Sequence, residues 1–183
     1  MAGAGTHGGI GGGRLARLTR KAAEALPAPS MVIFGSALWG MIMAATATTG
    51  LWLQNGLITA NLLAIVSAYF YGGSLAFAPA LWLTRLTLGK SNRLLRLIGA
   101  LIVIALSTHL ATSAIFALQY RVFYAHWHAS FPSIVWFFQL GFTSAGAVFT
   151  FTVGSLTFYW PFSCLAFLGF ALWFALGGAP RTH

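Results

Sequence analysis

Long apolar stretches separated by short polar segments dominate the chain from residue 30 onward. Runs of ~20 apolar residues are long enough to cross a bilayer as helices, whereas a membrane β-strand needs only ~10 residues of alternating polarity. The pattern therefore predicts an all-α fold, a polytopic transmembrane helical bundle in residues 30–178. Its predicted spans are Ser30–Trp52, Leu57–Trp82, Leu94–Tyr120, Phe131–Phe158 and Pro161–Leu176.

The fifth predicted span is short and follows the fourth almost directly. One helix over residues 131–176 would be ~70 Å long, more than twice the hydrocarbon thickness, so the chain must turn near Pro161. The sequence leaves open whether residues 161–176 cross or re-enter the membrane, so four spans and this one are expected. Pro132 and Pro161 are expected at helix starts, and Pro79 is expected to kink or end its helix.

Residues 14–29 have the pattern of a basic amphipathic helix followed by a proline-containing linker, with apolar and cationic residues on neighbouring faces. We expect this helix to lie in the headgroup layer with its cations on lipid phosphate, and a solvated basic tail is the alternative. The Gly-rich residues 1–13 are expected to form a disordered tail, and residues 179–183 a C-terminal tail.

The composition excludes a soluble domain, because 58% of the residues are hydrophobic and only 6% are charged, against about 25% charged in soluble proteins. Ten Lys and Arg face a single acid, Glu24. In a membrane protein this imbalance indicates loop sidedness and attraction of anionic lipid rather than nucleic acid. We expect eight of the cations to contact lipid phosphate: Arg14, Arg17, Arg20, Lys21, Arg85, Lys90, Arg93 and Arg96.

These eight cations precede the first span or lie between the second and third spans, so they must share one side of the membrane. The positive-inside rule makes that side cytoplasmic. We therefore expect a multi-pass protein of the bacterial inner membrane with a cytoplasmic N-terminus and, after five spans, an external C-terminus. The mitochondrial inner membrane is the alternative, because the N-terminal segment is Arg-rich and acid-poor.

Small residues recur at every fourth position in the first two spans. They predict close helix packing, because lipid supplies no hydrophobic drive for helix association. We expect packing within the chain, with another subunit as the alternative. The rows are Ser36, Gly40, Ala44 and Thr48 in the first span, and Gly72, Ala76 and Ala80 in the second.

The segment after the third span carries the interfacial residues Tyr120, Tyr124, His126, Trp127 and His128. Aromatic rings with polar tips are typical of the lipid–water boundary. The two histidines would point ~200° apart on a helix, and no cysteine or carboxylate lies nearby to complete the three or four ligands that a metal needs. We predict non-ligating interfacial histidines, with a metal or cofactor contact shared with another subunit as the alternative.

His109 lies near the middle of the third span, and an ionisable residue at that depth is a functional candidate. His126 would be ~25 Å further along a helix, too far to hold the same cofactor. We expect a neutral imidazole hydrogen-bonded to Thr, Ser or a carbonyl of a facing helix. The other intramembrane polar candidates are Thr112 and Ser113, on the same face, and Gln139, Thr143 and Ser144 in the fourth span.

The predicted spans contain no Asp or Glu, so the chain alone cannot build a carboxylate proton relay, and no catalytic motif is present. The single Cys164 is expected to be buried. We expect a non-catalytic accessory, assembly or stabilising subunit of a larger membrane complex, in contact with lipid and with other subunits or itself, without a cofactor. A small transporter or channel for an apolar or anionic solute is the alternative, and a haem- or pigment-binding subunit through His109 is a third hypothesis.

Overall fold

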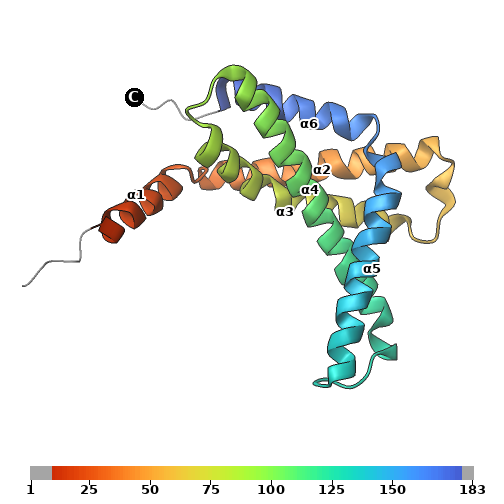
Figure 1. The fold of residues 1–183 in the computed structure, drawn as a ribbon. Helices are drawn as coiled ribbons and strands as arrows, with labels where there is room; N and C mark the ends of the chain where they lie inside the picture. The colour runs from red at the N-terminus through yellow and green to blue at the C-terminus, as the bar shows by residue number, and fades with distance from the viewer. Residues whose placement is uncertain (1–9, 179–183) are drawn as a thin grey trace, which may run out of the picture.

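The computed structural model describes residues 10–178, in which every regular element is helical. The four helices α2 to α5 are long and apolar enough to cross a membrane, which confirms the all-helical prediction at this level. The elements are α1 (Ile10–Glu24), α2 (Pro29–Leu53), the 3-10 turn η1 (Gly56–Ile58), α3 (Leu62–Leu88), α4 (Arg93–Tyr124), the 3-10 turn η2 (Ala125–Trp127), α5 (Ile134–Tyr159), α6 (Phe162–Trp173) and the π turn η3 (Phe174–Gly178) (Figure 1).

The predicted limits of the second span are wrong at both ends. α3 begins at Leu62 because Asn55, with a left-handed φ of 54°, and the turn η1 occupy the preceding residues. α3 then continues through Pro79 to Leu88 rather than ending at the proline. A proline removes only one backbone N–H, and packed membrane helices tolerate that loss.

The starts of the other helices follow their capping residues. α5 begins after Pro132, because the Ser133 side chain caps it by accepting a hydrogen bond from Trp136 N at 3.1 Å. Pro161 is the N-cap of α6, as its predicted position at a helix start requires. α1 begins four residues earlier than predicted, since helix ends extend by a turn once the adjacent turns have formed. The rest of the expected N-terminal tail, residues 1–9, and residues 179–183 lie outside the described residues.

α3 approaches both of its neighbours closely at glycines. A Cβ atom at Gly40 would overlap the Ser74 side chain and the Phe70 carbonyl of α3, and one at Gly72 would overlap the Thr112 backbone of α4. The whole α3 row of small residues is buried within the chain: Gly72, Ala76 and Ala80.

The predicted row on α2 lies only partly on the packed face. Gly40 is buried, Ser36 and Ala44 are half-buried, and Thr48 is exposed. A row at every fourth residue drifts ~40° per step around a helix of 3.6 residues per turn. The buried face of α2 therefore follows alternating steps of three and four residues: Trp39, Gly40, Met43, Thr46, Ala47, Gly50 and Leu51.

α6 packs antiparallel to α2. Near its start Ser163 Oγ donates to Thr46 Oγ1 at 2.9 Å, and further along the Phe170 ring lies 5.7 Å from that of Trp39. Ser163 and Phe170 occupy the buried face, so the adjacent Cys164 is exposed, and the prediction that it is buried is wrong.

The end of α6 lies beside the start of α4. Arg96, in the first turn of α4, donates from Nη2 to the Phe174 carbonyl at 2.6 Å, and its guanidinium lies 5.4 Å from the Phe174 ring centroid. α5 and α6 together therefore return the chain from the far end of α4 to its beginning. The sequence analysis expected the loop before α4 and the C-terminal end of the chain on opposite sides of the membrane. The structure instead places residues 89–92 and the end of α6 at the same end of the molecule.

α4 and α5 extend beyond the other helices as a two-helix arm, with residues 125–133 at its tip (Figure 1). Among the described side chains of α5, the buried ones are few and belong to its second half: Ala147, Phe151 and Ser155. Most of the arm's surface is therefore open to lipid or to another protein.

Reporter fusions test the path of α5 and α6. Fusions after Asn92 and after Gly177 should report the same side of the membrane, because Arg96 holds Phe174 at the start of α4. A fusion near Ser130, at the tip of the arm, should report the opposite side. Paired periplasmic and cytoplasmic reporter activities make the measurement, and opposite sides for residues 92 and 177 would contradict the arrangement.

Candidate functional site

The His109 imidazole lies between α4 and α5. Its Nε2 is 3.2 Å from Thr152 Oγ1 of α5. Because the Thr152 hydroxyl donates its only proton to the Val148 carbonyl at 2.8 Å, its oxygen is left to accept from the imidazole N–H. The ring also contacts Phe151 and Tyr159, with centroids 5.5 and 5.9 Å away. His109 is thus an interhelical hydrogen-bond donor in an aromatic setting.

Thr112 and Ser113 do not extend the polar surface around His109. Both are buried, and their hydroxyls donate to carbonyls of their own helix, Thr112 to Thr108 O at 2.7 Å and Ser113 to Leu110 O at 2.9 Å. Other hydroxyls of the spans do the same with carbonyls three or four residues earlier: Thr46, Thr48, Thr49, Thr84, Thr87 and Ser155.

The remaining polar candidates lie in the first half of α5, away from His109. Gln139 Oε1 accepts from Ala129 N at 2.8 Å and so ties the loop at the arm's tip to the helix. The Thr143 hydroxyl donates to the Gln139 carbonyl at 2.6 Å, and Ser144 is half-buried. Ser144 precedes Thr152 by about 12 Å of helix, so the six candidates do not gather at one place.

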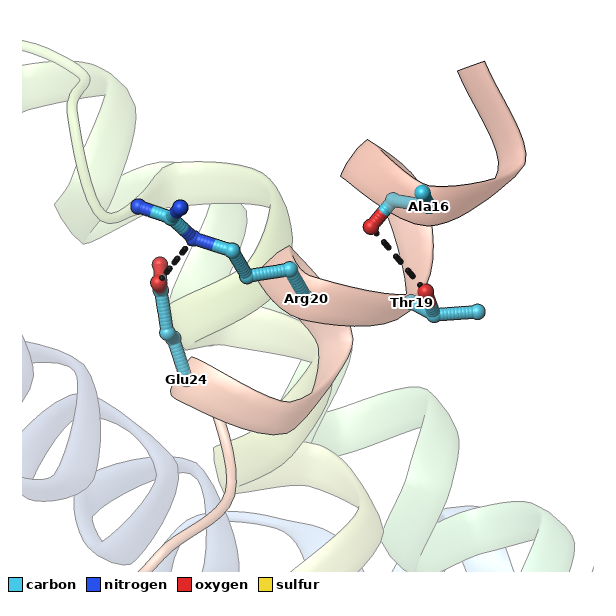
Figure 2. Close-up of polar contacts among 4 residues, drawn as sticks. All are labelled: Ala16, Thr19, Arg20 and Glu24. Atoms are coloured by element: carbon cyan, nitrogen blue, oxygen red, sulfur yellow. Dashed lines mark hydrogen bonds and ion pairs between the residues drawn. The ribbon is translucent and has the colours of Figure 1, made fainter. Parts of the chain in front are cut away.

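The cations divide into exposed and internal groups. Arg17, Arg20, Lys21, Lys90 and Arg93 are exposed, and Figure 2 shows Arg20 Nε paired with Glu24 Oε1 at 2.9 Å on α1. Arg85 and Arg96 are half-buried and contact protein atoms instead of being wholly available to lipid phosphate. The Arg14 side chain lies outside the described side chains.

The tip of the arm is an aromatic cluster. Tyr120 and Tyr124 have ring centroids 4.4 Å apart, and Tyr124 lies 5.3 Å from Trp127. The exposed His126 ring lies 3.9 Å from the Trp127 ring, and the half-buried His128 follows the turn η2. Within residues 10–178 no three His, Cys, Asp or Glu side chains come together as a possible metal site.

The sequence analysis missed two tyrosines: Tyr159, whose ring contacts His109, and Tyr69, whose ring contacts Tyr159. Tyr69 of α3 and Tyr159 of α5 have ring centroids 5.7 Å apart, and both hydroxyls are buried. A tyrosine inside an apolar run is the only signal that could have marked Tyr69. Comparison of the chain with known protein families, curated proteins and solved structures finds no match.

Substitution of His109 tests whether it does more than join α4 to α5. His109→Gln should cost about 0.6 kcal/mol of unfolding free energy, the average for polar contacts between membrane helices, because an amide N–H can also donate to Thr152. The measurement is thermal unfolding of four purified proteins: the wild type, His109→Gln, Thr152→Val and the double variant. Together they give the coupling free energy between His109 and Thr152. A haem or pigment absorption band that disappears in His109→Gln would contradict this interpretation.

Proposed function

We propose that the chain is a non-catalytic, multi-pass subunit of the bacterial inner membrane that assembles into a larger membrane complex through α5. The observation that supports this most strongly is that few described side chains of α5 are buried, on an arm that projects from the other helices (Figure 1). In the proposed orientation α1, residues 89–92 and the end of α6 lie in the cytoplasm, and the tip of the arm lies outside. The reason is that the exposed cations lie in α1 and around residues 89–92, and positively charged segments remain on the cytoplasmic side.

The polar contacts favour an assembly role over a solute path. A path needs hydroxyl and amide groups that remain available to a solute. Thr112, Ser113 and Thr143 instead direct their hydroxyls to carbonyls of their own helices. His109 is engaged with Thr152 on the facing helix. These groups therefore satisfy their own hydrogen bonds and stabilise the bundle.

α5 carries a surface suited to another membrane helix. Gly146, Thr150 and Gly154 recur at every fourth position and are exposed, and a Cβ atom at Gly146 would meet nothing within 4 Å. Large exposed rings lie on the same arm, including Phe142 at 75% and Phe149 at 70% exposure. Small residues permit close backbone contact between helices in lipid. The corresponding row on α3 is already used inside the chain, whereas Gly146 faces open space.

Gly146→Leu should remove the assembly without disturbing the chain, because the site is open in the isolated protein. The fraction of the chain in the large complex should fall about tenfold, equivalent to ~1.4 kcal/mol of association energy. Native gel electrophoresis of mild-detergent extracts from native membranes measures the complex.

The matched control is Gly169→Leu, on α6, where an added Cβ atom also meets nothing within 4 Å. This variant should leave the size and the amount of the complex unchanged. A complex that survives Gly146→Leu, or a wild-type chain that migrates alone, would contradict the assembly role of α5.

We also propose that α1 lies on anionic lipid. Its cations Arg17, Arg20 and Lys21 are exposed, and Trp82 Nε1 of α3 donates to the Ala22 carbonyl at 2.9 Å. This bond holds the end of α1 beside the end of a spanning helix, where lipid headgroups are within reach. Each cation near an anionic surface contributes about 1 kcal/mol, and Glu24 opposes this attraction through its pair with Arg20.

Two single substitutions on α1 should therefore have opposite effects. Arg17→Gln should weaken binding of an α1 peptide to vesicles containing anionic lipid about fivefold, and Glu24→Gln should strengthen it by a similar factor, from ~1 kcal/mol per charge. Vesicle co-sedimentation at low salt gives both values. Equal binding of all three peptides, or equal binding to neutral vesicles, would rule out the lipid-bound helix.

A further inference from the structure

Two side chains on one face of α3 hold the two ends of the segment that joins α1 to α2. Trp82 Nε1 donates to the Ala22 carbonyl, in the last turn of α1, at 2.9 Å. Arg85 Nη2 lies 3.2 Å from Met31 Sδ, in the first turn of α2. Trp82 and Arg85 are three residues apart and so are neighbours on the helix surface. Residues 22–31 therefore run alongside this face of α3 near its end.

The positive charge of Arg85 is not paired with a carboxylate. The guanidinium remains charged at physiological pH, and the residue is half-buried. Its contact with Met31 is weak, because a thioether sulfur is a poor acceptor. Glu24, the only acidic side chain of the sequence, is paired with Arg20 instead. Since an unpaired charge in a spanning helix is costly, we expect the counter-charge of Arg85 to come from outside the chain.

The position of Arg85 favours lipid phosphate as that anion. Arg85 lies in the last turn of α3, and the end of a spanning helix reaches the headgroup level, where tryptophans such as Trp82 are typical. Lys21 precedes Ala22 in α1, so the Trp82 bond brings a second, exposed cation to the same junction. Basic sites between membrane helices on the cytoplasmic side bind anionic headgroups. The junction has this combination of charge and depth.

We propose that the junction of α1, α2 and α3 binds the phosphate group of one anionic phospholipid. Arg85 is the main binding residue, and Lys21 supplies the second cation. The guanidinium exchanges its weak contact with Met31 for charge-assisted bonds to phosphate oxygens. This site rests on the proposed position of α1 and deepens it, because the cations of α1 attract anionic lipid in general whereas Arg85 retains a single molecule.

The test is native mass spectrometry of the full-length chain, purified in mild detergent and incubated with phosphatidylglycerol or with phosphatidylcholine. The wild type should retain one phosphatidylglycerol molecule in preference to phosphatidylcholine. Arg85→Gln should weaken this binding about tenfold, because the charge-assisted bonds to phosphate are lost. Arg85→Lys keeps the charge without the paired donors and should show a smaller loss, so a folding defect of the Gln variant does not decide the result.

Two matched variants serve as controls. Arg93→Gln removes an exposed cation from the first turn of α4 and should leave the retained lipid unchanged. Met31→Leu removes the sulfur contact of Arg85 and should also leave it unchanged, because phosphate replaces that contact. Equal retention of phosphatidylglycerol by the wild type and Arg85→Gln would overturn the proposal. Equal retention of phosphatidylcholine, or an equal loss in Arg93→Gln, would have the same consequence.

Inorganic phosphate distinguishes the two sources of the ligand. Millimolar phosphate should neither displace the retained lipid nor raise the Tm of the wild type. A rise in Tm that disappears in Arg85→Gln would assign the site to soluble phosphate and overturn the lipid site. The α1 peptides lack Arg85, so peptide binding to vesicles without a retained lipid would overturn this site alone. Absence of peptide binding would overturn the position of α1 instead.

Discussion

The close approach of α3 to α2 and α4 is the contact on which the rest of the structure depends. In lipid, apolar side chains gain nothing by leaving their surroundings, so helices associate through close packing and a few polar bonds. Gly72 allows α4 to reach the α3 backbone, and Gly40 does the same for α2. With both neighbours so close to α3, Trp39 Nε1 of α2 reaches Thr108 Oγ1 of α4 at 3.1 Å.

The hydrogen-bonded side chains of the helices find their partners in one of two ways. Most hydroxyls donate to carbonyls of their own helices, and such bonds do not depend on how two helices are placed relative to each other. A few bonds cross between helices and position the later elements: Ser163 to Thr46 for α6 and His109 to Thr152 for α5. With a single acid in the whole chain, Arg96 takes a backbone carbonyl as its partner instead of a carboxylate. That contact sets the end of α6.

The arm differs from the core in how its small residues are used. On α3 they are buried against neighbouring helices of the same chain, whereas Gly146 on α5 faces open space. Around His109, the hydroxyls of Thr112, Ser113 and Thr152 are engaged in structural hydrogen bonds. The surfaces that we propose for recognition are therefore the exposed face of α5 and the exposed cations of α1.

Hydropathy and charge by themselves determined the helical class, the four long helices and the basic amphipathic N-terminal helix, because these depend on local composition and on the length needed to cross a bilayer. Local pattern also identified the α3 row and the mid-helix histidine. It failed where a distant residue decides the outcome. The partner of His109 is forty-three positions away, and the Arg96 contact that returns α6 to the start of α4 spans seventy-eight. The face of α2 that packs, the exposure of Cys164 and the burial of the Tyr69 hydroxyl likewise depend on which helices meet, and only the tertiary structure decides that.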